Sequence, residues 1–232
     1  MDLILDGLAQ AIALIVGLDP EIIRIGSLTM AVSGTATIIS LLIGVPLGFT
    51  LGVNDFPGRS FLISIVNTGM GLPPVVVGLF VTIMLWRNGP LGLLHLLYTP
   101  TAMIIAQCVI ATPIIIGFTM AGVGQLDPRF RTQMLGLGAS NGQMVWLMLL
   151  EARLPILAAV MAGFGAIISE VGASMMVGGN IQGQTRVLTT ATVMETAKGN
   201  FALAIALSII LLVLTYLVNL FLTMVQQRGR AS

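Results

Sequence analysis

The chain has 232 residues, of which 56% are hydrophobic and only 8% are charged, and its formal net charge is +1. A soluble domain carries about 25% charged residues, so this chain must face lipid over most of its surface. The small net charge excludes a strongly basic nucleic-acid-binding surface. A single cysteine, Cys108, excludes a disulfide within the chain.

Residues 1–20 are predicted to form a short helix that lies at the membrane interface. Asp2 and Asp6 stand where a cleavable signal peptide would carry basic residues. Apolar and polar residues fall on opposite sides of this segment, and Pro20 ends it. The pattern is typical of an interfacial amphipathic helix rather than of a span.

Residues 21–227 are predicted to form an all-α transmembrane domain of about five spans, followed by a cytoplasmic tail over residues 228–232. A helix needs about 20 apolar residues to cross the bilayer core. Charge-free runs predict spans at Ile25–Asn54, Ser60–Trp86, about Thr101–Val123, about Leu154–Val177 and about Phe201–Val225.

The second of these spans contains Gly71, Pro73 and Pro74. Prolines in mid-membrane remove backbone donors and kink a helix. The freed carbonyl groups cannot face lipid, so they must face protein or a water-filled cavity. These residues therefore predict part of a transport pathway; the alternative is an ordinary kink that serves packing.

The connection over about residues 124–153 is a polar stretch between apolar runs. Within it, Thr132–Leu150 carries no charge but many polar residues and glycines, a composition that inserts poorly into lipid. It is predicted to form two short helices near the membrane surface, with a turn around Gly138–Gly142, and a sixth span is the alternative. Such a loop is expected to contact a separate motor protein in water.

Glu170 is the one acid well inside an apolar segment. An intramembrane carboxylate is a functional hypothesis by default, here a gate acid. The alternative is a structural acid that an arginine or backbone donors satisfy. Because Gly172 and Gly178-Gly179-Asn180 indicate that the helix is ending, the structural interpretation is favoured.

The motifs of several enzyme classes are missing from the sequence. His95 is the only histidine and cannot build a metal site alone, so no metal site is predicted. The only lysine, Lys198, lies outside any Gly-x-x-x-x-Gly-Lys-Ser/Thr pattern. We therefore expect no catalytic residues, no bound cofactor and no ATP hydrolysis by this chain; ATP would be used by a partner.

Gly138-Ala139-Ser140, twelve residues before Leu150, resembles the coupling motif of type I ATP-binding cassette permeases. That motif has Glu-Ala-Ala, three residues, Gly, eleven residues and Leu-Pro. Here its first positions hold Thr132-Gln133-Met134, and its last hold Leu150 and Glu151, with Leu154-Pro155 one helical turn late. The glycine and its neighbours match, and the flanks do not.

A wider resemblance, to the tungstate permease branch of that family, covers most of the chain. It is carried by Asn67–Leu79, Leu97–Met103, Ile168–Ala173, Gly178–Ile181 and Thr185–Ala191. Molybdate and sulfate permeases share a looser version of the last stretch.

The resemblance implies the type I permease core fold, a prokaryotic inner-membrane location and a homodimer. It also implies a cytoplasmic ATPase and an external oxyanion-binding protein as partners. The cytoplasmic coupling residues would be Gly138, Ala139, Ser140, Asn141 and Leu150. In the outer loop of about residues 178–200, Asn180 and Arg186 are candidates for docking the binding protein, although Arg186 could equally be a solvated loop charge.

The function expected from these features is an importer permease for a tetrahedral oxyanion, with tungstate as the first expectation. Molybdate and sulfate are alternatives because both are also tetrahedral dianions. More remote alternatives are an autonomous channel or carrier, and a membrane-embedded enzyme that uses Glu170 with His95.

Overall fold

A computed structural model describes residues 2–17 and 19–228, and within them it contains helices and no strands. The helices are α1 Asp2–Val16, α2 Pro20–Val53, α3 Arg59–Met70, α4 Pro74–Leu85, the 3₁₀ helix η1 Gly92–Leu94, α5 Pro100–Gly124, α6 Pro128–Gly136, α7 Asn141–Glu151, α8 Arg153–Ile168, α9 Gly172–Gly178, α10 Leu188–Ala197 and α11 Phe201–Arg228. The all-α prediction is confirmed. Of the predicted tail, residues 229–232 lie outside the described residues.

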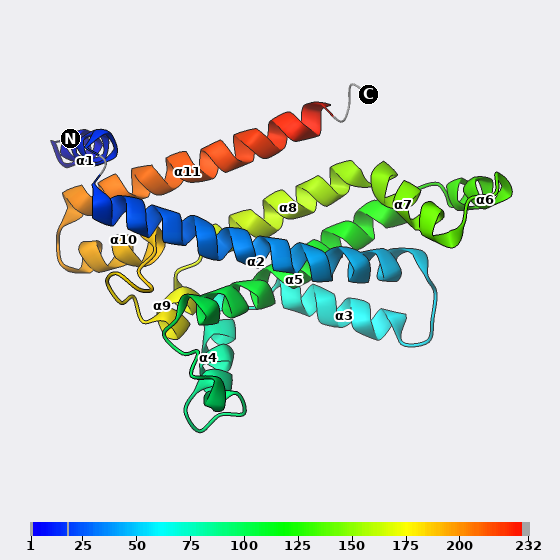
Figure 1. Ribbon diagram of the computed structural model, residues 1–232, viewed down its shortest axis with the longest axis horizontal. Helices are drawn as coiled ribbons and strands as arrows, with labels where there is room; N and C mark the ends of the chain where they lie inside the picture. Colours follow the sequence, from blue (N-terminus) through cyan, green and yellow to red (C-terminus); the bar gives the residue numbers. More distant parts are fainter. Residues whose placement is uncertain (1, 18, 229–232) are drawn as a thin grey trace.

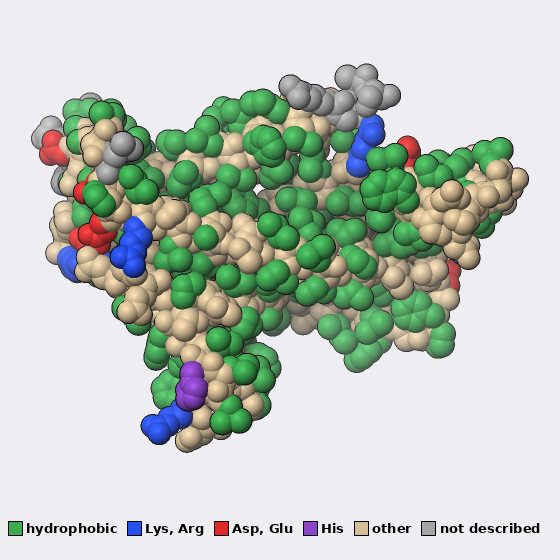
Figure 2. Space-filling model, viewed as in Figure 1, with side chains coloured by type: hydrophobic (Ala, Val, Ile, Leu, Met, Phe, Trp, Pro, Cys, Tyr) green, Lys and Arg blue, Asp and Glu red, His purple; other side chains and the backbone are tan. Residues whose placement is uncertain are grey.

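The long helices run along the long axis of the molecule, with α6 and α7 at one end and α1 and α10 at the other (Figure 1). In the described chain, α2, α5 and α11 are long and apolar enough to cross a bilayer. The bent pairs α3–α4 and α7–α8 raise the number to five if each pair is one span. Apolar side chains cover much of the visible face, and charged ones gather toward its ends (Figure 2).

Side-chain caps fix where two of the long helices begin. Asp19 accepts hydrogen bonds from the N–H groups of Glu21 and Ile22 at 3.0 and 3.1 Å, and Pro20 is the first residue of α2. Thr99 caps α5 by accepting from Ala102 N at 3.3 Å. These caps satisfy backbone donors that a helix start leaves unpaired.

The second predicted span is two helices rather than one kinked helix, which corrects the expectation over 60–86. The axis turns by 103° between α3 and α4, and α4 leaves the bundle (Figure 1). Pro73 is the N-cap of α4 and Pro74 its first residue. Because those positions need no backbone donor, the prolines begin a helix here instead of distorting one.

The fourth span also differs from the predicted 154–177. Helix α8 ends at Ile168, and a separate short helix, α9, begins at Gly172. At its other end α8 continues into α7 through a 65° bend. The sequence predicts a span over about 154–177 that Glu170 interrupts, and the interruption is the start of a new helix, as described below.

The core forms where glycines let α2 approach α5 closely. Gly44, Gly48 and Gly52 recur every four residues along α2. A Cβ on Gly44 would lie 2.7 Å from Ile115 Cγ2, and one on Gly48 would lie 2.6 Å from the Ile116 carbonyl oxygen. Small residues at this spacing are typical of closely packed membrane helices. These three glycines of α2 therefore pack against α5 of the same chain.

Helix α1 packs against the N-terminal half of α11, where Gly7 meets Ile205. In Figure 1 it is seen nearly end-on, so it lies across the direction of the spans. Ile4, Leu5 and Ile12 are exposed on it. The location of α1 at a membrane interface stays a prediction, and its crosswise arrangement agrees with that prediction.

Candidate functional site

The predicted turn between two short helices is present at residues 137–140. Helix α6 ends with the N–H of Gly138 on the Leu135 carbonyl and the N–H of Ala139 on the Met134 carbonyl, both at 3.0 Å. This pair of bonds is a Schellman motif, which needs a left-handed residue after the helix. Gly138 supplies it with φ +86°, a conformation that costs other residues about 1–2 kcal/mol.

Helix α7 begins immediately with a capping box. The N–H of Gln143 bonds to Ser140 Oγ at 3.4 Å, and the Ser140 N–H bonds to Gln143 Oε1 at 2.8 Å. Such reciprocal bonds satisfy two of the orphan donors at a helix start. Gly138, Ser140 and Asn141 are exposed on this turn, whereas Ala139 is half-buried.

Leu150 is not part of the turn. It lies nine positions after Asn141 on α7, roughly 13 Å along the helix axis. Its side chain is 45% exposed. The structure thus brings four of the five predicted coupling residues together and leaves the fifth at the other end of α7.

A groove of about 640 Å³ lies between α6 and α7, and we call it the coupling groove. Its lining is mainly apolar: Met134, Leu137, Gly138, Ala139, Gly142, Gln143, Trp146 and Leu147. Leu137 is 81% exposed and Trp146 is 67% exposed. Large apolar side chains left open in this way are typical of binding surfaces. Neither residue is among the predicted coupling residues, although Gly142 and Trp146 are one helical turn apart.

The opposite face of α7 is held in a core. Met144 and Met148 are buried in a cluster with Phe49 of α2, Val123 of α5 and Ala152. Helix α7 therefore joins the coupling groove directly to α2 and α5, two long helices of the bundle.

The loop over residues 179–187, at the other end of the molecule, is closed by its own hydrogen bonds. Thr185 Oγ1 donates to the Gly178 carbonyl at 2.5 Å and accepts from Ile181 N at 3.0 Å. The Ile181 carbonyl accepts from the N–H groups of Gln184, Thr185 and Arg186. The loop is therefore a compact unit that presents its side chains in fixed directions.

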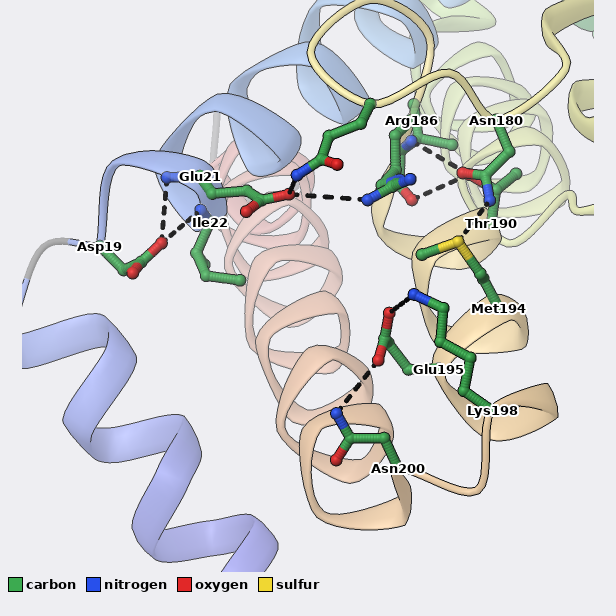
Figure 3. Close-up of polar contacts among 12 residues, drawn as sticks. Asp19, Glu21, Ile22, Asn180, Arg186, Thr190, Met194, Glu195, Lys198 and Asn200 are labelled. Carbon is green, nitrogen blue, oxygen red and sulfur yellow. Dashed lines mark hydrogen bonds and ion pairs between the residues drawn. The ribbon is translucent and has the colours of Figure 1, made fainter.

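Arg186 points from this loop toward the start of α2 (Figure 3). Its NH1 lies 3.6 Å from Glu21 Oε1, and its side chain is 14% exposed. Gln182 Nε2 donates to the same Glu21 oxygen at 2.7 Å. Asn180 instead directs its amide nitrogen to Met194 Sδ at 3.5 Å. The two predicted docking residues thus share one loop, and the guanidinium of Arg186 lies largely beneath its surface.

A second ion pair stands on α10, in the same region. Glu195 accepts from Lys198 Nζ at 2.8 Å and from Asn200 Nδ2 at 3.1 Å. The hydrogen bond from Lys198 holds the pKa of Glu195 below its ordinary value, against the opposing effect of burial. These contacts tie the end of α10 to the start of α11 (Figure 3).

Glu170 acts as a helix cap. Its Oε1 accepts the Ala173 N–H at 3.0 Å, and its backbone carbonyl accepts from Thr189 Oγ1 at 3.2 Å. A Cβ on Gly172 would lie 2.7 Å from Val75 Cγ2. The structure therefore brings the Glu170 segment against the first turn of α4, beside the corner formed by Gly71, Pro73 and Pro74.

His95 gives no sign of a metal site. It occupies the left-handed position after η1, with φ +51°. Among the described residues, no group of three or more His, Cys, Asp or Glu side chains is arranged to hold a metal ion.

Comparison with known proteins gives a consistent result. Residues 44–231 match the family described as binding-protein-dependent transport system inner membrane component. The chain is 38% identical to the tungstate uptake system permease protein of Peptoclostridium acidaminophilum, over 98% of this chain and 100% of that one. It is 36% identical to the protein of the same description from Campylobacter jejuni, over 94% and 92% of the two chains.

More distant matches extend the comparison. The molybdenum transport system permease protein of Escherichia coli is 26% identical, over 88% of this chain and 94% of that one. A solved methionine ABC transporter in an inward-facing conformation superposes with a TM-score of 0.75 at 19% identity, over 92% of this chain and 98% of that one. The second of these comparisons concerns the fold alone.

Proposed function

The chain belongs to the inner-membrane components of binding-protein-dependent transport systems, and we propose that it is the permease subunit of a tungstate importer. The observation that carries the proposal is its identity of 38% and 36% to two tungstate uptake permeases over nearly the whole chain. The match to a molybdenum permease is weaker, at 26%. Molybdate, and after it sulfate, is therefore the alternative cargo.

The ATPase is a separate subunit that binds at the coupling groove. The sequence carries no phosphate-binding loop, so ATP is bound and hydrolysed by that partner. The exposed turn of Gly138, Ser140 and Asn141 and the open side chains of Leu137 and Trp146 support the assignment. This end of the molecule faces the cytoplasm, where the ATPase subunit binds. The ATPase hydrolyses ATP, and this chain forms the transport pathway.

The opposite end faces the external binding protein. Its candidate docking surface is the loop of about residues 178–200, in which Asn180 is half-buried and Arg186 supports the loop from beneath. Two copies of the chain enclose the pathway, because three straight and two bent spans are few to surround an anion. Helix α4 is a candidate contact surface for the second copy, because its apolar side chains Val75, Leu79 and Phe80 are exposed.

Movement at the coupling groove reaches the pathway through packed helices. Helix α7 shares its core with α2 and α5, so closure of the ATPase would rock these helices together. A dianion is costly in a low-dielectric environment unless hydrogen-bond donors meet it. At the Gly71–Pro74 corner the N–H groups of Gly71 and Leu72 already bond to the Thr68 and Gly69 carbonyls, and prolines have no N–H. Ser and Thr hydroxyls are therefore the donors proposed along the path. Glu170 keeps the adjacent helix start in place as a cap.

Reconstitution tests the proposal. The permease, its ATPase and the external binding protein are placed in proteoliposomes, and uptake of tungstate, molybdate and sulfate is compared with and without ATP. Tungstate uptake that needs both ATP and the binding protein supports the proposal. Uptake restricted to molybdate or sulfate would replace the cargo, and uptake without any ATPase would favour an autonomous carrier.

A further inference from the structure

A cavity of about 350 Å³ opens between the start of α2 and the loop that carries Arg186. We call it the reception cavity. Its lining combines apolar side chains with polar ones and is positively charged on balance: Pro20, Glu21, Arg24, Ile25, Leu28, Gln182, Gly183, Gln184 and Arg186. Only 8% of the residues in this chain are charged. Two guanidinium groups on one cavity are therefore an unusual concentration of positive charge, which suits an anionic ligand.

Arg186 has unused hydrogen-bonding capacity. Its side chain is only 14% exposed, and its one ion pair, with Glu21, has an N–O distance of 3.6 Å. Its Nε is buried and has no acceptor among the described residues. Buried donors are nearly always paired in folded proteins. An anion that replaces Glu21 would give the Arg186 guanidinium a further acceptor.

Glu21 occupies the place where such an anion would bind. One carboxylate oxygen, Oε1, accepts from Gln182 and lies toward Arg186, so the same donors converge on it. The Glu21 side chain is 51% exposed. A side chain that is half exposed can rotate into solvent without disturbing the core, which would free both donors.

The charges of the reception cavity fit a dianion. Arg24 and Arg186 together carry two positive charges, and Glu21 neutralises one of them in this structure. Arg24 donates one N–H to the Gly183 carbonyl, and a guanidinium has five N–H donors. With Glu21 rotated away, two guanidiniums and the Gln182 amide would face a ligand of charge −2. Arginine is the side chain best suited to binding several oxygens of such an anion.

We infer that the reception cavity is a transient binding site for a tetrahedral dianion, and that the Glu21 carboxylate occupies it until the dianion displaces it. The site would receive cargo released by the binding protein before the cargo enters the pathway. The identification of the dianion as tungstate rests on the proposed function. The location of the site rests on Glu21, Gln182 and Arg186.

The test is direct binding without the external protein. The permease–ATPase complex in lipid nanodiscs is titrated with sodium tungstate by calorimetry at constant ionic strength. Glu21→Gln should bind tungstate at least tenfold more tightly than the wild type, because the competing carboxylate is gone. Adding Arg186→Gln to that variant should remove the gain. The control is Arg87→Gln, which alters an exposed arginine outside the cavity and should match the wild type.

The outcomes separate this inference from the proposed function. The reception cavity would be overturned if, for each of tungstate, molybdate and sulfate, the wild type, Glu21→Gln and Arg87→Gln bound the anion with equal affinity. This would hold even if the full system imports tungstate. Binding that depends on Glu21 and Arg186 but is restricted to sulfate or molybdate would keep the cavity and change the cargo. If the Arg186→Gln complex does not assemble, Arg24→Gln replaces it and is expected to remove the same gain.

Discussion

A Cβ placed on Gly48 of α2 would stand 2.6 Å from the backbone carbonyl oxygen of Ile116 on α5. Because the obstacle is backbone, no side-chain rotation can relieve it. Gly48→Ala should therefore force α2 and α5 apart and destabilise the fold by roughly 1–3 kcal/mol. Gly34→Ala, in the same helix with nothing within 4 Å of the new Cβ, is the matched control. Unfolding in mixed micelles with increasing dodecyl sulfate measures both, and equal stability of the two variants would contradict this packing.

Gly138→Val should uncouple transport from ATP hydrolysis. The positive φ of +86° at Gly138 strains a β-branched residue, so the turn between α6 and α7 would change shape. Uptake in proteoliposomes should be lost while the protein stays in the membrane. Gly136→Ala is the control, because this glycine ends α6 without a positive φ and a Cβ on it meets nothing. Normal uptake by Gly138→Val would refute the coupling role of the turn.

Trp146→Ala should weaken binding of the ATPase without destabilising the permease. The indole is 67% exposed and lines the coupling groove, so its removal leaves no internal cavity. Exposed tryptophans at interfaces often contribute about 2 kcal/mol or more, which corresponds to a loss of at least tenfold in affinity. Surface-immobilised permease titrated with ATPase measures it. Trp86→Ala, which removes the other tryptophan at the distant end of α4, should bind as the wild type does.

Glu170→Gln should keep both fold and transport. The amide oxygen of Gln can still accept the Ala173 N–H that Glu170 accepts at 3.0 Å. Glu170→Ala removes this acceptor and should cost about 0.5–2 kcal/mol, as loss of a helix cap does. Thermal unfolding and uptake are measured for both variants. A Gln variant that unfolds normally but no longer transports would point to the negative charge, and so to a gate.

The Glu195–Lys198 pair should stabilise the fold at neutral pH and lose this effect in acid. The pKa of Glu195 is lower in the folded chain than its ordinary value of 4.5. The stabilisation is therefore fully present above that value and is lost as pH falls through the folded-state pKa. Since Lys198 is 56% exposed, a contribution of about 0.2–1 kcal/mol is expected. The difference in thermal midpoint between the wild type and Glu195→Gln should shrink below about pH 4; a constant difference would exclude the charge effect.

Local chemistry made the coupling turn predictable from the sequence. Gly138 and Ser140 each determine their own backbone surroundings, one through positive φ and one through a capping box. Charge-free runs likewise predicted the long helices, because crossing a bilayer sets a minimum length. The exposed Leu137 and Trp146 were missed, since an apolar residue beside a membrane segment gives no sign of which side it faces.

The corner at Pro73 and Pro74 could not be predicted, because the same residues suit a mid-helix kink and a helix start. The choice depends on distant packing: Gly69 meets Pro113 of α5, and Gly78 meets Ala173 of α9. The pairing of Glu21 with Arg186 has the same character. The two residues come from opposite parts of the chain, and only the fold brings their charges together.

Two methionines beneath the coupling groove form the contact between α7 and the helices α2 and α5. Met144 and Met148 are unbranched and buried between α7, α2 and α5. Such side chains change rotamer readily and refill the space around them. These side chains can therefore repack without opening a void when α7 moves, so α7 stays in contact with α2 and α5 and carries them with it.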